Sequence, residues 1–272
     1  MPFSLSSLSR RPVVLTACAA VVVALVAVAL FVPLPFTIMY PGITANTLGS
    51  FDGQRVITIT GHPLRTVDGE LRMVTIAATP PQESVSVESA IRAWWNPAQA
   101  VVPRDAVYPA GQSVAQVTAT NEQEMEDSQD SATTAALDYL KLSPSQVKVT
   151  INLADVGGPS AGLLFTLGII DELNGNGTGR TGAAGDLTNG SIVAGTGEID
   201  AAGNVSQVGG VALKTKAAAR DGATVFLVPR AECSDAEAGL PKDLRLVPVS
   251  TLTDAVNALN ALQTGAGTVP SC

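Results

Sequence analysis

The most continuous hydrophobic segment of the chain lies near its N-terminus. Val13–Val32 contains no charged side chain, and its length matches the roughly 20 apolar residues that a helix needs to cross a bilayer. Prolines, which disfavour a continuing helix, follow at positions 33 and 35. We therefore predict one transmembrane helix over residues 13–34.

The charges before this segment predict its orientation. Arg10 and Arg11 precede it, and an excess of basic residues marks the cytoplasmic side of a membrane helix. Residues 1–12 are then cytoplasmic, and the rest of the chain is extracytoplasmic, held at the cell membrane. A signal peptide with Ala27-Val28-Ala29 as its cleavage site is the alternative, although the apolar run continues beyond that site.

Residues 35–142 are predicted to form a small β-rich extracytoplasmic region. Arg55–Thr60 and Leu71–Ala77 are extended segments separated by turn residues, which predicts an antiparallel hairpin. Asn121–Leu142 has helical periodicity, and its acidic front half suits the positive end of a helix dipole. The packing side of this helix is predicted to comprise Ala132, Ala135, Ala136, Tyr139 and Leu140.

A shorter helix is predicted over Glu83–Trp95. Its candidate buried positions are Val85, Val87, Ile91 and Trp94. The pair Trp94-Trp95 is interpreted as core packing, because it lies well away from the predicted span. Tryptophan also concentrates at membrane–water interfaces, so an interface anchor is the alternative.

A C-terminal domain is predicted over residues 143–272, after the helix-ending Ser143-Pro144-Ser145. Val147–Leu153 alternates apolar and polar residues, which predicts a strand with one buried face. An apolar helix follows, in which Asp171 and Glu172 are expected to face solvent. The apolar side of that helix is predicted to consist of Leu163, Leu164, Leu167 and Ile170.

A glycine-rich segment, Asn174–Gly190, interrupts the pattern after this helix. It lacks a preceding strand, so it is not a dinucleotide loop. We interpret it as a flexible surface insertion, with a substrate-gating loop as the alternative. Beyond it, a hairpin is predicted around Asp200–Gly203, and Thr251 with Asp254 forms a helix-starting box. Two buried strands are predicted over Thr224–Val228 and Leu244–Val249, which gives a mixed α/β core.

The composition narrows the classes of function. The net charge of −8 and the pI of about 4.6 argue against nucleic acid as a partner. The single histidine, His62, lies in a loop-like stretch, which argues against a Ser-His-Asp triad and against a zinc site with histidine ligands. The sequence contains no GxxxxGK[ST] phosphate loop, so no nucleotide is expected. The chemistry considered below needs no metal or other cofactor, and none is expected.

The turn before the apolar helix carries the first candidate for chemistry. Gly157-Gly158-Pro159 leads into Ser160 at the helix start. Backbone N–H groups there have no partner within the helix, so they stabilise an anion. A hydroxyl in that position can attack a carbonyl while the N–H groups bind the oxyanion. A capping serine in a tight strand-to-helix turn is the alternative.

Lys214 is the candidate base for this serine. The residues three and four positions from it are Gly210, Val211, Ala217 and Ala218, all small or apolar. Lys214 is therefore expected to point inward, whereas Lys216, with Arg220 one turn on, is expected to point outward. Burial lowers the pKa of a lysine from about 10.4, and a value of roughly 7–8 suits a general base. A lysine that snorkels along an amphipathic helix is the alternative.

These segments resemble three motifs of Lon-type serine peptidases, in the same order. Gly157–Gly162 resembles the nucleophile motif, and Gly195–Asp200 resembles the characteristic turn that follows it. Gly209-Gly210 resembles the start of the lysine segment, with Lys214 in the position that the family pattern requires. The resemblance covers roughly residue 147 to the end of the fold and favours an α+β arrangement.

The resemblance implies a role for each matching residue. Ser160 becomes the nucleophile, Lys214 the base, and Thr196 a hydroxyl that orients the lysine. The backbone at Gly158 and Ala161 supports the serine at the start of its helix. The implied substrate is a protein or peptide outside the membrane, and a non-catalytic binding or scaffold protein that keeps the peptidase fold is the alternative.

The chain also departs from Lon proteases with ATPase rings. Those proteins usually carry an acidic residue three positions before the serine, where this chain has Gly157. Together with the missing phosphate loop, this departure makes the chain look like the membrane-anchored, ATP-independent branch of the family. That branch commonly carries a PDZ module, for which the sequence leaves no room before residue 143.

The cysteines fit an extracytoplasmic location. Cys18 lies within the predicted span, which leaves Cys233 and Cys272 beyond it. An even pair of cysteines in an oxidising compartment can form a disulfide bond. Such a bond would tie the C-terminal tail to the domain and stabilise it by roughly 3–4 kcal/mol in the loop-entropy model. Two free thiols are the alternative.

Overall fold

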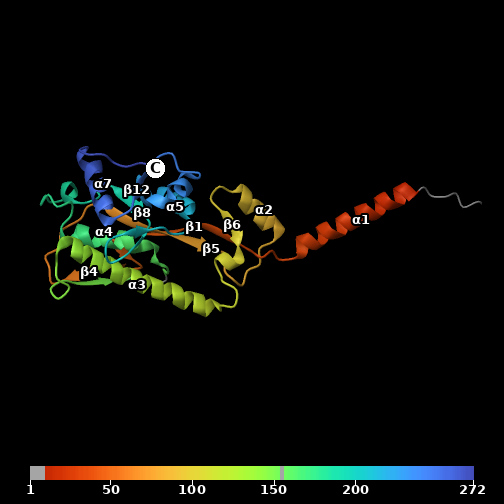
Figure 1. Ribbon diagram of the computed structural model, residues 1–272, viewed down its shortest axis with the longest axis horizontal. Helices are drawn as coiled ribbons and strands as arrows, with labels where there is room; N and C mark the ends of the chain where they lie inside the picture. The colour runs from red at the N-terminus through yellow and green to blue at the C-terminus, as the bar shows by residue number, and fades with distance from the viewer. Residues whose placement is uncertain (1–9, 154–155) are drawn as a thin grey trace, which may run out of the picture.

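A computed structural model describes residues 10–153 and 156–272 of the chain (Figure 1). The most N-terminal element is a single long helix, α1 (Arg10–Phe31), which extends away from the rest of the molecule. Its segment Arg11–Val28 is long and apolar enough to cross a membrane, and none of that segment is buried against the protein. Most of the predicted cytoplasmic segment, residues 1–9, lies outside the described residues.

A six-stranded sheet forms the centre of the domain. Its strand order is β12-β11-β8-β5-β1-β6. The first four strands in this order are parallel, whereas β1 is antiparallel to both of its neighbours. The predicted α+β fold class is confirmed, because the sheet contains both parallel and antiparallel pairs rather than parallel ones alone. The strands are β1 (Phe36–Asn46), β5 (Glu70–Ala78), β6 (Ala100–Pro103), β8 (Ile192–Gly195), β11 (Val225–Pro229) and β12 (Arg245–Val249).

Helices cover both faces of this sheet. Successive side chains of β11 point to opposite faces, so Leu227 packs with α4 and α7 while Phe226 packs with α5 and α6. Helix α3 lies outside α4 and contacts it along much of its length (Figure 1). The helices are α2 (Val87–Trp95), α3 (Val114–Leu140), α4 (Gly162–Leu173), α5 (Val211–Arg220), α6 (Cys233–Glu237) and α7 (Leu252–Thr264).

Shorter elements connect these layers. The predicted hairpin around Asp200–Gly203 is present as the antiparallel pair β9–β10. The predicted capping box is also confirmed, because Thr251 and Asp254 exchange hydrogen bonds at the start of α7. The short elements are β2 (Ser50–Phe51), β3 (Gln54–Arg55), β9 (Glu198–Ile199), β10 (Val205–Ser206), and the 3-10 turns η1 (Arg104–Ala106), η2 (Pro159–Ala161), η3 (Ala183–Gly185) and η4 (Arg230–Glu232).

The sheet joins the two segments that the sequence divides at residue 143. Strand β5 comes from the N-terminal segment, and it pairs in parallel with β8 of the C-terminal segment. One hydrophobic core likewise contains Leu71 from the first segment and Leu164 from the second. Residues on both sides of the predicted boundary at 143 therefore share one sheet and one hydrophobic core.

The predicted hairpin between Arg55–Thr60 and Leu71–Ala77 is wrong. The first of these segments contributes β4 (Ile57–Thr60), which pairs antiparallel with β7 (Lys148–Ile151) in a separate two-stranded sheet. The second contributes β5, which lies between β8 and β1. Ile57 and Ile59 are buried and belong to the same core as α4, which favours this longer-range pairing over the local hairpin.

The long helix α3 begins earlier than predicted. Ser113 caps it, exchanging hydrogen bonds with Gln116, so the helix starts at Val114 rather than near Asn121. Its acidic residues therefore lie in the middle of the helix, where the dipole argument does not apply. Tyr139, predicted to pack inward, is 38% exposed, whereas the predicted alanines are buried.

The solvent-facing positions predicted for α4 are also wrong. All twelve residues of α4 are buried, because α3, the sheet, β4 and α7 surround it. Glu172 pairs with Arg55. Asp171 accepts a hydrogen bond from the Leu187 N–H at 2.8 Å, and its other oxygen has no partner in the described part of the chain.

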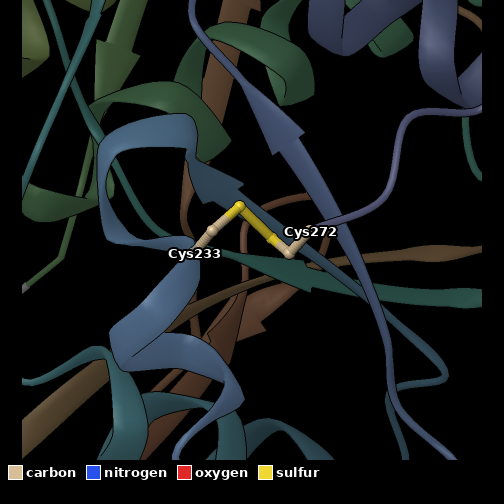
Figure 2. The surroundings of a disulfide bond; sticks show 2 residues. All are labelled: Cys233 and Cys272. Carbon is tan, nitrogen blue, oxygen red and sulfur yellow. A yellow bond between two sulfur atoms is a disulfide. The ribbon is translucent and has the colours of Figure 1, made fainter.

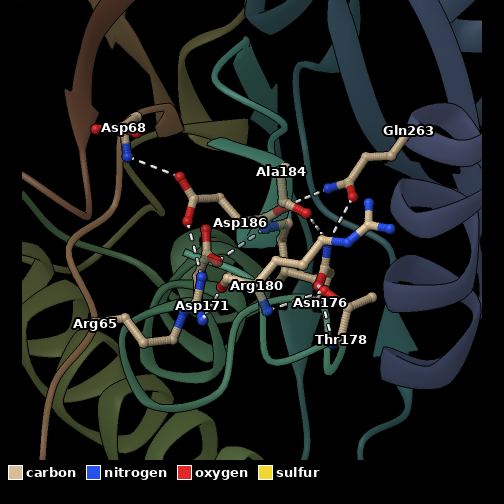
Figure 3. Close-up of polar contacts among 10 residues, drawn as sticks. Arg65, Asp68, Asp171, Asn176, Thr178, Arg180, Ala184, Asp186 and Gln263 are labelled. Carbon is tan, nitrogen blue, oxygen red and sulfur yellow. Dashed lines mark hydrogen bonds and ion pairs between the residues drawn. The ribbon is translucent and has the colours of Figure 1, made fainter. Parts of the chain in front are cut away.

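The glycine-rich segment is attached to the domain by a polar network (Figure 3). Asp186 is fully buried, pairs with Arg65 and accepts the Asp68 N–H at 2.8 Å. Asn176 donates to the Gln263 side chain of α7 at 2.8 Å. Residues 185–188 are buried, so the prediction of a flexible surface insertion is wrong for that part of the segment.

The C-terminal tail returns to the domain through a disulfide bond. Cys233, at the start of α6, is joined to Cys272 (Figure 2). The bond closes a loop of 39 residues in sequence separation, which includes β12 and α7. Cys18 in α1 is a free, exposed cysteine.

Candidate active site

Ser160 lies in a sharp turn that two glycines make possible. It belongs to η2, directly before α4. Gly158 has a φ of +87°, a conformation that residues with a Cβ rarely adopt. A Cβ on Gly157 would lie 2.7 Å from the Cβ of Asn121 on α3. Gly157 stands where Lon proteases with ATPase rings usually have an acidic residue. The close approach of α3 leaves no room for a Cβ at this position, so a glycine is required.

Helix α3 also fixes this turn by hydrogen bonds. The Gly158 N–H donates to the Asn121 carbonyl at 2.9 Å, and the Ser128 hydroxyl donates to the Pro159 carbonyl at 3.0 Å. Ser128 is itself buried. Because its N–H is already bonded, Gly158 cannot offer that donor to an oxyanion in this conformation.

The N–H groups of Ser160 and Ala161 differ from that of Gly158, because they form no such hydrogen bond with α3. Apart from hydrogen bonds internal to η2 and α4, neither the Ser160 N–H nor the Ala161 N–H donates to an acceptor among the described residues. Both lie at the start of a helix, where unpaired donors and the helix dipole stabilise negative charge. These two amides are therefore the candidates for binding an oxyanion, and Ser160 is partly exposed beside them.

Lys214 approaches from the other face of the sheet. It lies on α5 and is only 2% exposed, as predicted from its small neighbours. Its Nζ donates a hydrogen bond to Oγ1 of Thr196 at 3.0 Å. Lys216, two residues on, is half-buried. The inward position of Lys214 follows from helical periodicity, since Ala217 and Ala218 on the same side are fully buried.

Thr196 connects the lysine to the serine turn. It directly follows β8, at the carboxyl end of the parallel strands, where α/β folds commonly place their sites. Its hydroxyl donates to the Ser160 carbonyl at 3.1 Å, and the Gly197 N–H donates to the same oxygen at 2.9 Å. The structure thus brings Lys214, Thr196 and the Ser160 backbone together. In the described part of the chain, Nζ of Lys214 hydrogen-bonds Thr196 and does not hydrogen-bond Ser160 directly.

The electrostatics of the lysine follow from its burial. Desolvation lowers the pKa of Lys214 to about 8, and the carboxylate of Glu232 acts in the opposite direction. Glu232 is 6% exposed and accepts the Val208 N–H at 2.9 Å. Burial raises the pKa of Glu232, while the Val208 hydrogen bond and Lys214 lower it. Sequence reasoning missed Glu232, because it lies on η4 and shares no periodic pattern with Lys214.

Two hollows flank the serine turn, and both are lined by Val156 and Gly157. One, of about 630 Å³, lies between this segment and α3 and includes Asn121 and Glu122. The other, of about 430 Å³, lies against β1 and β5. An extended peptide could therefore pass on either side of the residues that precede Ser160.

Other candidate chemistries find no support near this site. His62 lies in the loop after β4, and its Nδ1 is 2.8 Å from the Pro63 carbonyl oxygen. Within residues 10–153 and 156–272, no group of three or more His, Cys, Asp or Glu side chains could hold a metal ion.

Comparisons with known proteins identify the class of the C-terminal segment as a serine peptidase. Residues 146–262 match the family model of the Lon protease (S16) C-terminal proteolytic domain. The chain is similar to the Lon protease of Neorickettsia sennetsu, with 33% identity over 103 residues, and to that of Xanthomonas oryzae pv. oryzae, with 30% identity over 124 residues.

These matches cover limited parts of each protein. They span 36% and 44% of this chain, but only 11% and 13% of the two relatives. The matched segment contains Ser160, Thr196 and Lys214. The family resemblance predicted from the sequence motifs is confirmed for this segment.

Proposed function

We propose that this chain is a serine endopeptidase in which Ser160 is the nucleophile and Lys214 the general base. The observation that carries the proposal is the buried amine of Lys214, whose pKa is about 8 and whose hydrogen bond to Thr196 links it to the Ser160 backbone. A buried amine of this kind is neutral in a substantial fraction of molecules near pH 8, so it can accept a proton.

The reaction follows the pattern of acyl transfer. As the Ser160 hydroxyl attacks the peptide carbonyl carbon, its proton moves to Nζ of Lys214. The carbonyl oxygen becomes an oxyanion, which the amides of Ser160 and Ala161 stabilise. Lys214 then protonates the leaving amine, and the acyl-enzyme remains. A water molecule, deprotonated by the same lysine, releases the acid product and restores Ser160.

The setting of this reaction is also part of the proposal. Helix α1 anchors the chain in a membrane, and the basic residues before it place the peptidase domain on the extracytoplasmic side. The disulfide between Cys233 and Cys272 suits an oxidising compartment. The substrate is a protein or peptide bound beside Val156 and Gly157, and hydrolysis uses no nucleotide.

A covalent probe tests the nucleophile. We expect a fluorophosphonate probe to label the full chain in detergent micelles and the label to map to Ser160 by peptide mass spectrometry. Ser160→Ala is expected to abolish labelling while leaving the fold unchanged by circular dichroism. Ser234→Ala is the control, because it removes an exposed hydroxyl on α6 that the mechanism does not use. Labelling that persists in Ser160→Ala would exclude Ser160.

The same experiment separates the alternative functions. A non-catalytic binding or scaffold protein would not be labelled at all. A peptidase restricted to self-cleavage would be labelled but would not hydrolyse added peptides. An endopeptidase would be labelled and would turn over a denatured protein substrate.

Glu232 provides a test of the lysine as base. Glu232→Gln removes the negative charge that raises the pKa of Lys214 but keeps an acceptor for the Val208 N–H. We expect the pKa of Lys214 to fall, so the rise of kcat/KM with pH moves to lower pH. Glu237→Gln, at an exposed position on the adjacent α6, should leave the profile unchanged. An unshifted profile in Glu232→Gln would contradict the assignment of Lys214.

A further inference from the structure

Helix α2 carries the most exposed aromatic side chains in the described part of the domain. Trp94 and Trp95 are 76% and 80% exposed, and Ile91 on the same side is 53% exposed. The prediction that Trp94 packs in the core is therefore wrong. Of the nine residues of α2, the structure buries only Ala93.

The exposed residues form one face of a well-defined helix. Ile91, Trp94 and Trp95 have the spacing i, i+3 and i+4, which places them side by side on the outward face. The ion pair between Glu88 and Arg92 borders this face. A capping box at Ser86 starts the helix, so its conformation does not depend on covering the tryptophans. The face is apolar, fixed in place and unpartnered within the described chain.

The position of α2 relates this face to the membrane helix. The Leu34 N–H donates to the Val85 carbonyl at 2.9 Å, which connects the residues after α1 with those before α2. Helices α1 and α2 are also in contact. In Figure 1, α2 lies at the end of the domain from which α1 departs. The tryptophans are therefore held close to the level at which α1 leaves a bilayer.

We propose that α2 is a second membrane contact, whose Trp94 and Trp95 insert into the headgroup region beside the end of α1. This inference rests on the proposed anchoring of the chain by α1. Indole rings concentrate at that depth because one edge is apolar and the N–H can hydrogen-bond. Arg92 at the border of the face can meet lipid phosphates.

A lipid surface is the occupant that fits these observations. The apolar face is small and shallow and has a charged border, as in helices that lie in the plane of the interface. Its contact with the membrane helix gives it a lipid neighbour without any further partner. A second contact would restrict the rotation of the domain about α1 and hold the site at a fixed height above the bilayer.

The two tryptophans are the only ones in the chain, so intrinsic fluorescence reports on this face alone. The full chain is reconstituted into phosphatidylcholine–phosphatidylglycerol vesicles, with bromine atoms placed either near the headgroup or near the acyl-chain end. We expect stronger quenching by the shallow bromines than by the deep ones. Trp94→Phe and Trp95→Phe assign the quenching to each ring.

A matched control places the fluorophore elsewhere. In the Trp94→Phe/Trp95→Phe background, Tyr139→Trp puts an indole near the C-terminal end of α3, whereas α1 departs from the opposite end of the domain (Figure 1). Its emission should not respond to either brominated lipid.

Flotation of the vesicles separates this inference from the proposed anchoring. If the chain floats with the vesicles but Trp94 and Trp95 are not quenched, α1 is inserted and the second contact is refuted. If the chain does not float with the vesicles, the proposed anchoring fails and the inference fails with it. Blue-shifted emission that depends on protein concentration and not on bromine would refute the inference in favour of a second copy of the chain.

Discussion

Lys214→Arg is expected to lower kcat/KM for peptide cleavage by roughly 10²–10⁴-fold, the contribution typical of a positioned acid–base group. The substitution keeps the positive charge, but a guanidinium does not release its proton in proteins. It therefore cannot accept the proton of Ser160. In the unmodified chain, kcat/KM should rise as the pH passes through about 8, where Lys214 becomes neutral. Both results come from steady-state kinetics on a fluorogenic peptide over pH 6 to about 10.

Two further variants make this result interpretable. Lys216→Arg, on the same helix and half-buried, should retain activity and the same pH profile. Lys214→Met removes the charge that the fold buries, so it should be inactive although it remains folded. Full activity in Lys214→Arg would exclude Lys214 as the general base.

Asp171 is expected to make the stability of the domain depend strongly on pH. Burial raises its pKa from 3.8 to about 7, with Asp186 acting in the same direction and the Leu187 N–H and Arg65 opposing it. The folded state therefore holds a proton that the unfolded state releases between pH 4 and 7. By linkage, this group stabilises the fold fully below pH 4, and that contribution is lost as the pH rises toward 7.

The rise in the pKa of Asp171 sets the size of this change in the free energy of unfolding, which is about 4 kcal/mol at most. Asp171→Asn carries no ionisable proton, and its side-chain oxygen can still accept the Leu187 N–H. Urea unfolding of the full chain in micelles should show the variant to be more stable than the unmodified protein at pH 8, with little difference at pH 4. Asp243→Asn, at an exposed position, is the control. An equal difference at both pH values would contradict the proposed titration.

Short-range signals predicted much of the site. The neighbours of Lys214 on α5 are all small or apolar, so helical periodicity alone indicates that it points inward. The Gly157-Gly158 pair likewise predicts a tight turn before Ser160, and α3 fills the space that a Cβ would need at Gly157. The burial of Lys214 and the tight turn depend on residues within one or two turns of each other, so the sequence contains them, whereas the packing of α3 against Gly157 is a long-range contact.

Long-range contacts explain the errors. Asp171 and Glu172 look like the polar face of an amphipathic helix, but their partners lie on segments distant in sequence. Arg55 comes from β3 and the Leu187 N–H from the glycine-rich segment. The hairpin between residues 55 and 77 fails for a similar reason, since β4 pairs with a strand about 90 residues further along the chain. The sequence analysis missed the effect of Glu232 on the pKa of Lys214 for the same reason, because the two residues lie on different elements.

The central position of β5 has a consequence for how the chain can be divided. The segment that matches the peptidase family begins at residue 146, but β8 within it pairs with β5 along one of its two edges. A fragment cut at that point would present a bare strand edge, which invites pairing with other chains. The catalytic segment is thus not a transplantable module, and any shortened version must keep the stretch from β1 to β5.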